Sequence, residues 1–390
     1  MILSEAFRTL TYPQWFSIYL KKDLGAGDEE IGFVNAVQSG ASLLLQPLGG
    51  AVGQKFNKKR LYLLGLVIQA LAFLIAFLAE DWTWTILMSL ILGCSALVGP
   101  GVLALIGEIT DRATRATAFA LKATIISLTV MLQGPLQGFI AQTVGLRPLY
   151  LLAIIGLTVS FLIFLLFFRD VERERSTEKG DVPTGRESSK NWKRQVRQVF
   201  AKPDYRRNFI GLIGTGVAWR LFVNGFSPFI TIYLYEEIGW SFLFFGFYGF
   251  AGSLLALVLQ IPFGKLMDKY HLKRIFFFIG PLIDGIRLLL LVFVRDPYLL
   301  AAIFLFESAT GIGHVLAVTA LWYDAIPIEV YSIGSAISGV IYGCTEVVGF
   351  LLDAYLWASL GPVSFYIMST GRLLSSFVAL HLIRDIKNEK

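Results

Sequence analysis

Ten charged side chains lie inside long apolar stretches of this sequence, and they are the residues best placed to do chemistry. A charge at the depth of a bilayer costs roughly 2.5–3.5 kcal/mol, so each one needs a partner or a task. The ten residues are Glu5, Arg8, Lys122, Arg220, Asp284, Arg287, Glu307, Glu346, Asp353 and Arg372. Glu307 and His314 are seven residues apart, and Glu346 and Asp353 have the same spacing. Seven residues are close to two helical turns, so the spacing predicts that each pair shares one helix face.

A carboxyl group enclosed in a cavity can exchange a proton with whichever side of a membrane it faces. Glu307 is our first candidate for this role, and Glu346 and Asp353 follow. Arg220 would be the cation that pairs either with the carboxylate or with a bound solute, which couples the proton to the solute. In the structural alternative, the two lower-ranked carboxylates simply pair across helices with Arg220 or Lys122.

The remaining intramembrane charges fall into two groups. Asp284 and Arg287 are three residues apart and can pair on their own helix. Together with Arg372 we interpret them as a structural ion-pair group. Glu5 and Arg8, in the first apolar stretch, form a second candidate site.

Twelve apolar stretches position these residues. Hydrophobic residues make up 55% of the chain and charged residues 16%, whereas soluble domains carry about a quarter charged residues. The stretches are continuously apolar rather than alternating, and each is long enough to cross about 30 Å of hydrocarbon as a helix. We therefore predict an all-α membrane protein. Its spans are expected at 1–20, 30–52, 61–79, 84–106, 116–141, 148–168, 207–233, 242–263, 275–294, 298–320, 332–358 and 363–383.

The sequence contains an internal repeat. Segments 18–60 and 232–274 align without a gap, and 14 of the 43 aligned residues are identical. Duplicated membrane halves are typical of secondary transporters, in which the solute path runs between the halves. The repeat predicts a first six-helix bundle at 1–168, a charged cytoplasmic linker at 169–206, and a second bundle with a short tail at 207–390.

The distribution of basic residues predicts the orientation. Lysines and arginines concentrate in the linker and in the two repeated loops at 55–60 and 265–274, whereas acidic residues dominate the opposite loops. An excess of Lys and Arg marks the cytoplasmic side, so both termini are expected there. Aligned on the repeat, the first span lacks its cytoplasmic end. We expect that the start of translation lies upstream of Met1, and the alternative is a helix that begins within the membrane.

The two repeated loops resemble a motif of the major facilitator superfamily. Gly50-Ala-Val-Gly-Gln-Lys and Gly264-Lys-Leu-Met-Asp-Lys are similar to the Gly-x-x-x-Asp-(Arg/Lys) loop that the family has after spans two and eight. The resemblance covers nearly the whole chain. It implies two pseudo-symmetric six-helix bundles and a gating role for these loops. The residues at the corresponding positions are Gly50, Gln54, Lys55, Arg115, Gly264, Asp268 and Lys269.

The first loop departs from the family pattern. Gln54 stands where the acid is expected, so the charged latch to Arg115 is weakened and Asp268 in the second copy is expected to carry the lock. We expect the glycines to permit a tight exit from each helix. The alternative is that both loops are ordinary basic loops of the cytoplasmic side.

Gly134-Pro-Leu-Gln-Gly138, in the fifth span, resembles an element emphasised in the drug/proton antiporters of that family. The antiporter pattern is incomplete, because Phe139 stands where its second closing glycine is expected. We favour a structural interpretation, in which glycine lets two helix backbones approach and proline bends the helix.

Three functions remain open from the sequence. The first is a proton-coupled secondary transporter at the plasma membrane that exports amphiphilic, drug-like compounds. The second is a proton- or sodium-coupled symporter that takes up a small metabolite, and an unpaired Arg220 would favour an anionic one. The third is a membrane sensor that does not transport. We find no metal-ligand spacing, P-loop or nucleophile motif, and we expect a monomer in the lipid bilayer with no cofactor, no enzymatic activity and no nucleic-acid partner.

Overall fold

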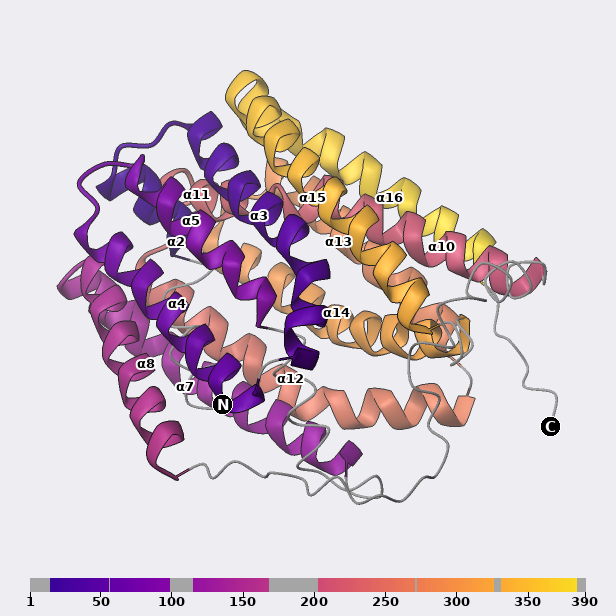
Figure 1. The fold of residues 1–390 in the computed structure, drawn as a ribbon. Coiled ribbons are helices and arrows are strands. Elements are labelled where there is room, and N and C mark those ends of the chain that lie inside the picture. The colour runs from indigo at the N-terminus through magenta and orange to yellow at the C-terminus, as the bar shows by residue number, and fades with distance from the viewer. Residues whose placement is uncertain are drawn as a thin grey trace, which may run out of the picture.

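The computed structural model describes residues 15–55, 57–98, 115–167, 203–270, 272–325 and 331–383. Every regular element in these residues is a helix, and the helices form one bundle (Figure 1). The predicted all-α class is confirmed. The number of spans and the side of the membrane on which the termini lie stay predictions.

The described part of the first half contains four long helices and several short ones. The elements are α2 (Phe16–Ile18), the π-helix η1 (Tyr19–Asp23), α3 (Asp28–Lys55), α4 (Lys58–Leu78), α5 (Trp84–Cys94), η2 (Ser95–Leu97), α7 (Arg115–Thr143) and α8 (Arg147–Phe167). The long helices agree with the predicted second, third, fifth and sixth spans. The fourth predicted span, 84–106, continues beyond Val98 into residues outside the described part.

The second half begins at α10, and a break divides its first span. The elements are α10 (Pro203–Trp219), the π-helix η3 (Arg220–Asn224), α11 (Ser227–Glu236), α12 (Phe242–Tyr270), α13 (Lys273–Phe293), α14 (Pro297–Ala325), α15 (Tyr331–Leu360), η4 (Gly361–Val363) and α16 (Ser364–Leu382). The predicted linker, 169–206, lies outside the described residues except for its last residues, which are already helical because α10 begins at Pro203.

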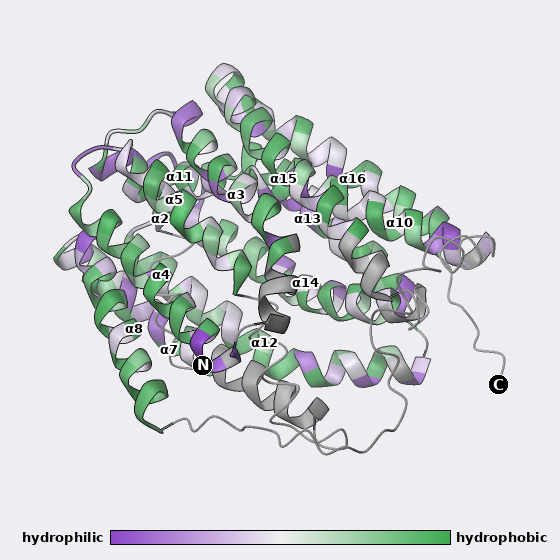
Figure 2. Cartoon of the chain, viewed as in Figure 1, coloured by the Kyte–Doolittle hydropathy of each residue, from purple (hydrophilic) through white to green (hydrophobic). Residues whose placement is uncertain are grey.

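The helices of the bundle are hydrophobic along most of their lengths (Figure 2). Within the described residues, seven segments are long and apolar enough to cross a membrane, and the last of them, Ile337–Leu382, contains both α15 and α16. Large apolar side chains such as Leu44 and Phe167 are 75% and 80% exposed. Lipid, rather than water, is the solvent that suits such a surface.

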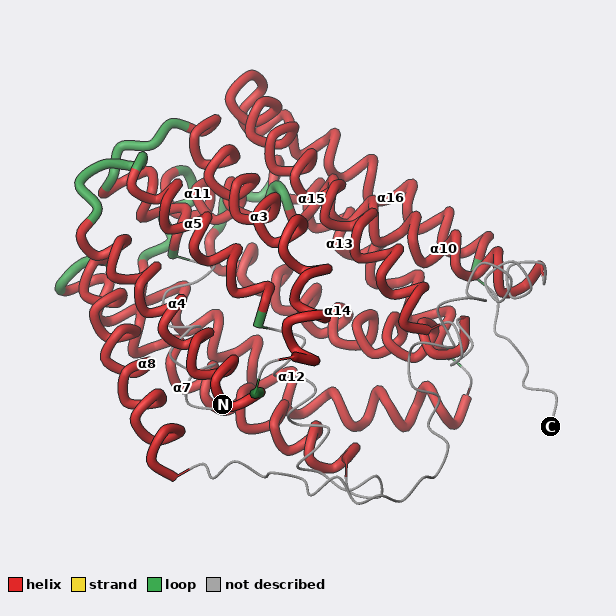
Figure 3. The backbone as a smooth tube through the Cα atoms, viewed as in Figure 1, coloured by secondary structure: helices red, strands yellow, loops and turns green. Residues whose placement is uncertain are grey.

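The repeat found in the sequence has the same local structure in both copies. The amide of Leu24 donates to the carbonyl of Tyr19, and the amide of Ile238 donates to the carbonyl of Tyr233, both at 3.2 Å. Gly25 and the matching Gly239 both have a positive φ, at 69° and 79°, which glycine adopts without steric cost. Most of the short loops, these two turns included, lie at one end of the bundle (Figure 3).

Two pairs of helices join the halves: α3 packs against α15, and α7 packs against α12. Gly134 and Gly246 face each other where α7 crosses α12. A Cβ added to Gly134 would lie 2.5 Å from the backbone oxygen of Gly246, and a Cβ on Gly246 would lie 2.3 Å from that of Gly134. Pro135 follows inside α7. This contact agrees with the structural interpretation of the Gly-Pro element.

Charged side chains also connect the halves. They lie between η1, which directly precedes the first of the two turns, and the end of α11. The ammonium of Lys21 lies 3.0 Å from an oxygen of Asp28 and 3.1 Å from an oxygen of Glu236 in the other half. Lys22 donates to the hydroxyl of Tyr235 at 2.8 Å. Burial opposes the charged form of Lys21, but the hydrogen bonds to both carboxylates prevail and raise its pKa above the usual value. We call these interactions the Lys21 contact, and they connect the halves at this end of the bundle.

Candidate functional site

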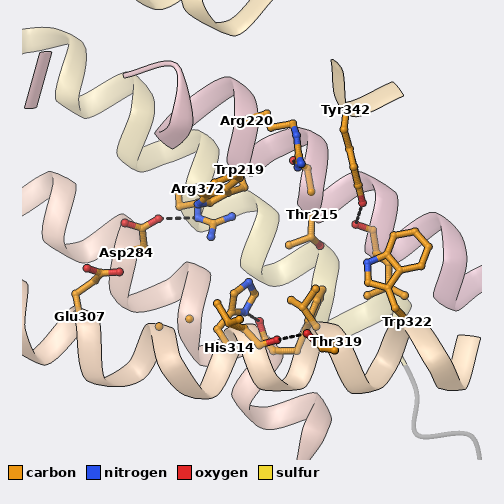
Figure 4. A pocket seen from close by; sticks show the side chains of 17 residues that line it. Thr215, Trp219, Arg220, Asp284, Glu307, His314, Thr319, Trp322, Tyr342 and Arg372 are labelled. Carbon is orange, nitrogen blue, oxygen red and sulfur yellow. Dashed lines mark hydrogen bonds and ion pairs between the residues drawn. The ribbon is translucent and has the colours of Figure 1, made fainter. Parts of the chain in front are cut away.

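An aromatic cavity of about 430 Å³ opens within the second half, and all of its lining residues lie between Leu212 and Arg372. Trp219, Trp322 and Tyr342 form much of its wall. Glu307 lies beside Asp284 and Arg372 at one end of the cavity, and Trp322 and Tyr342 lie at the other (Figure 4). Apolar walls with a few converging polar groups are typical of small-molecule sites.

A buried ion network closes one end of the aromatic cavity. An oxygen of Asp284 accepts a hydrogen bond from Arg287 at 2.6 Å, and its other oxygen accepts one from Arg372 at 2.9 Å. Glu307 joins the network through Arg287, with 3.9 Å between the nearest nitrogen and oxygen. These contacts agree with the ion-pair group expected from the sequence and add Glu307 to it. The network holds two carboxylates and two guanidinium groups, so its charges balance.

Glu307 lines the aromatic cavity, but its cation is not the one expected. The sequence analysis placed Arg220 beside it, whereas among the described residues the ion-pair partner is Arg287. The reason is the packing of neighbouring helices: α13 carries Arg287 directly against α14, which carries Glu307. The expected pairing of Glu307 with Arg220 was therefore wrong.

His314 lines the same cavity as Glu307, so the seven-residue spacing correctly predicted a shared face. The Nδ1 atom of His314 lies 3.1 Å from the carbonyl oxygen of Phe277, within hydrogen-bond reach. Gly280 makes room for the ring, because a Cβ at this position would lie 2.4 Å from the Cβ of His314. The imidazole is thereby fixed against α13.

Arg220 pairs with Glu346, as the structural alternative predicted. Their nearest atoms, Nε and Oε2, are 3.9 Å apart. The guanidinium of Arg220 also lies 3.9 Å from the centre of the Tyr342 ring and donates to the carbonyl of Gly216 at 3.2 Å. Asn224 donates to the other oxygen of Glu346 at 2.9 Å. The sequence analysis missed Tyr342 and Asn224, although an asparagine four residues after Arg220 in an apolar span is itself a signal.

Asp353 does not line the aromatic cavity, and it does not line the second pocket between the halves, to which Glu346 belongs. Its side chain is fully buried, and neither carboxylate oxygen has a hydrogen-bond partner among the described residues. It lies against Gly225, where a Cβ would be 2.5 Å from the Oδ2 atom of Asp353. The structure therefore separates Asp353 from Glu346 despite their spacing.

Several predicted residues lie wholly or partly outside the described part. Glu5 and Arg8, the second candidate site, fall there entirely, and so does the side chain of Lys122. The side chains of Gln54, Lys55, Arg115 and Asp268 fall there as well, although their backbones are helical. Of the second loop, Lys269 is exposed and lies 5.0 Å from the ring of Tyr270.

The two loop glycines do not end their helices. Gly264 lies inside α12, which continues to Tyr270, and Gly50 lies inside α3, which continues to Lys55. The expected tight exit at these glycines was therefore wrong. The helical ladder continues past both positions, and each helix ends in the residues that follow.

A second, polar pocket of about 300 Å³ lies between the halves. The first half contributes Ser17 and Asn35 from α2 and α3, and the second contributes Asn224, Thr231 and Glu346. The sequence analysis predicted a path between the halves but identified only Glu346 of this pocket. Serine and threonine are common in membrane helices, so Ser17 and Thr231 carried little signal, whereas Asn35 and Asn224 were signals that were missed.

Comparison with known proteins identifies the family. A family model described as Major Facilitator Superfamily matches residues 1–224. The "Quinolone resistance protein NorA" of Staphylococcus aureus (strain COL) is 23% identical over 280 residues, which cover 72% of this chain and 68% of that protein. The "Multidrug resistance protein MdtG" of Salmonella schwarzengrund (strain CVM19633) is 26% identical over 356 residues, which cover 88% of this chain and 82% of that protein.

Solved structures share the fold. A crystal structure of the peptide transporter POT in complex with alafosfalin superposes with a TM-score of 0.73 at 12% identity, covering 97% of this chain and 92% of that one. A bacterial homologue of the human lysosomal transporter Spinster, in an inward-facing and unoccupied conformation, gives a TM-score of 0.72 at 12% identity, covering 98% and 94%. The chain belongs to the Major Facilitator Superfamily and is a multi-pass membrane transporter of that family.

Proposed function

We propose that the protein is a proton-coupled secondary transporter that exports amphiphilic, drug-like compounds across the plasma membrane. The observation that carries the proposal is the position of Glu307, which lines the aromatic cavity and joins the ion network through Arg287. The names of the two relatives, a quinolone resistance protein and a multidrug resistance protein, support drug-like cargo.

The charge balance of the ion network determines whether a bound proton favours or opposes binding of the cargo. With Glu307 ionised, the two carboxylates balance Arg287 and Arg372. A proton on Glu307 leaves one uncompensated positive charge at the wall of the cavity. At low effective dielectric this charge repels a cationic cargo. Proton and cargo therefore exclude each other, which is the requirement for exchange of one against the other.

Alternating access would come from rocking of the two halves, 1–168 and 207–390, with the linker 169–206 on the cytoplasmic side. The Lys21 contact and the Gly134–Gly246 crossing hold the halves together, and we propose that they close one end of the bundle. In our proposal that end faces outward and opens when the halves rock. The basic loops with Gln54, Arg115, Asp268 and Lys269 would then hold the opposite end.

Transport into proteoliposomes tests the coupling. Vesicles with an acidic lumen, diluted into neutral buffer with ethidium, should accumulate this fluorescent cation as protons leave. Glu307→Gln removes the exchangeable proton, so gradient-driven accumulation should fall to the level of empty vesicles while exchange without a gradient continues. Glu237→Gln, an exposed carboxylate in a loop, is the matched control. Gradient-driven accumulation that Glu307→Gln leaves unchanged would remove Glu307 from the coupling role.

A second candidate function is uptake of a small anionic metabolite together with a proton or sodium ion. The guanidinium of Arg220 favours it, because this group lines the aromatic cavity and its ion pair with Glu346 is long. The same vesicles discriminate between the two. An acidic exterior, or external sodium, should then drive accumulation of a radiolabelled dicarboxylate such as succinate, and ethidium should not respond to the pH gradient.

A further inference from the structure

An ion pair lies between the polar pocket and the aromatic cavity. Arg220 lines the aromatic cavity, Glu346 lines the polar pocket, and their nearest atoms are 3.9 Å apart. The two sites differ in chemistry. The aromatic cavity has charges of both signs in its wall, whereas Glu346 is the one charged residue among the described residues that line the polar pocket.

The polar pocket is built to accept hydrogen bonds. The side-chain amide of Asn224 donates to Glu346, and that of Asn35 donates to the carbonyl of Ile31. The NH2 group of each amide is therefore bonded within the protein, and its oxygen remains an acceptor. The hydroxyl of Ser17 is buried and has no hydrogen-bond partner among the described residues. Amide carbonyls, hydroxyls and a carboxylate together suit a group that donates several hydrogen bonds and carries positive charge.

Aromatic rings complete these surroundings. Phe16 from the first half and Phe350 from the second both line the polar pocket. The face of an aromatic ring attracts a cation electrostatically. The aromatic residues of this pocket therefore favour the same kind of ligand group as its carboxylate.

Arg220 lies beside the second oxygen of Glu346 but makes no hydrogen bond to it. A separation of 3.9 Å between Nε and Oε2 is too long for a hydrogen bond. Arg220 instead donates to the carbonyl of Gly216 and lies over the ring of Tyr342. Because Asn224 holds only Oε1 of Glu346, the second oxygen is available to another donor.

We propose that the polar pocket binds the protonated amine of an aromatic cargo on Glu346, while the aromatic body of the cargo lies in the adjoining aromatic cavity. This inference rests on the proposed export of amphiphilic compounds and narrows it to aromatic amines. It also assigns cargo and proton to different carboxylates, since Glu346 holds the cationic head and Glu307 holds the proton.

Binding of three fluorescent probes that share one aromatic body tests the head-group preference. The probes are 2-(1-naphthyl)ethylamine, 2-(1-naphthyl)ethanol and 1-naphthylacetate, titrated into the full-length purified protein in detergent at neutral pH without any gradient. The amine should bind more tightly than the alcohol, and the carboxylate should bind most weakly. Glu346→Gln should weaken the amine roughly ten- to hundredfold, the worth of a hydrogen bond to a charged group, and leave the alcohol unchanged.

Two further variants distinguish an amine-binding role of Glu346 from a role in stability alone. Glu346→Asp keeps the charge and should recover part of the amine affinity. Arg220→Gln removes the competing cation, so the amine should bind more tightly than it does to the unsubstituted protein. Retained binding of the alcohol shows that each variant is folded, and Glu237→Gln is the control for a change of charge elsewhere.

The inference is overturned if amine and alcohol bind equally well, if Glu346→Gln leaves the preference intact, or if the carboxylate binds most tightly and Arg220→Gln abolishes its binding. Failure of the proposed coupling looks different, because the binding assay uses no gradient. Loss of gradient-driven flux with the head-group preference intact contradicts proton coupling alone, and flux without the preference contradicts the amine site alone.

Discussion

At the scale of single residues, the ion network is the feature whose energetics are most sharply defined. Asp284 compensates two buried guanidinium groups at once. Removing one partner of a buried ion pair usually costs about 3–5 kcal/mol, because the remaining charge stays buried without compensation. We therefore expect Asp284→Asn to be much less stable to thermal unfolding in detergent than the unsubstituted protein.

The matched control for Asp284→Asn is Glu237→Gln, which also removes one carboxylate but from an exposed loop. Adding Arg372→Gln to Asp284→Asn should restore part of the lost stability, because one of the two orphaned cations is then gone. An unchanged midpoint in Asp284→Asn, or a double variant that loses the sum of both single effects, would contradict a charge-balanced network.

Much of this residue-scale picture was predictable from the sequence, and its limits have a physical cause. Spacing along one helix correctly placed Glu307 with His314 and paired Asp284 with Arg287. It could not rank partners across helices, so Arg220 was assigned to Glu307 although Glu346 is its partner. Spacing also failed for Asp353, because sharing a face with Glu346 does not say that the whole face borders one cavity.

At the scale of helices, the crossing of α7 and α12 depends on the absence of side chains. A Cβ at Gly246 would lie 2.3 Å from the backbone oxygen of Gly134, whereas a Cβ at Gly252 on the same helix meets nothing within 4 Å. Gly246→Ala should therefore destabilise the protein by about 1–3 kcal/mol, the usual cost of overpacking. Gly252→Ala, the matched control, should be neutral or stabilising by about 0.4–1 kcal/mol. Equal thermal midpoints for the two variants would contradict the close crossing.

Most ends of the long helices were predicted to within about five residues, because continuous apolar runs and charged loops mark them clearly, whereas α12 continues to Tyr270, well past its predicted end at 263. The break of the seventh span into α10, η3 and α11 was not predicted. The hydropathy of 207–233 is continuous across the break, although Pro228 lies in the first turn of α11. A neighbouring helix also approaches closely there, because a Cβ at Gly349 of α15 would lie 2.7 Å from the backbone oxygen of Arg220. Sequence periodicity carries no information about such an approach between helices.

At the scale of the whole molecule, the account depends on two halves that move against each other. The repeat predicted the matching halves, and the shared turn at Gly25 and Gly239 confirms that both copies fold alike locally. The cavities were harder to predict, because each one depends on how neighbouring helices tilt. The sequence placed the solute path between the halves, where the polar pocket lies, but it did not predict an aromatic cavity within the second half.

A reversible cross-link across the Lys21 contact tests this motion most directly. Cys94 and Cys344 are first replaced by alanine, and Lys21→Cys is then combined with Glu236→Cys, which joins the halves, or with Asp28→Cys, which stays within the first half. Because the ion pairs join the ends of long side chains, the cysteines are linked with a bifunctional methanethiosulfonate, which spans more than a direct disulfide and is released by reduction. Gradient-driven flux into proteoliposomes is measured before cross-linking, after cross-linking and after reduction. Cross-linking should stop flux in the first pair alone, and reduction should restore it. Undiminished flux through a fully cross-linked Lys21→Cys/Glu236→Cys protein would contradict transport by rocking of the halves.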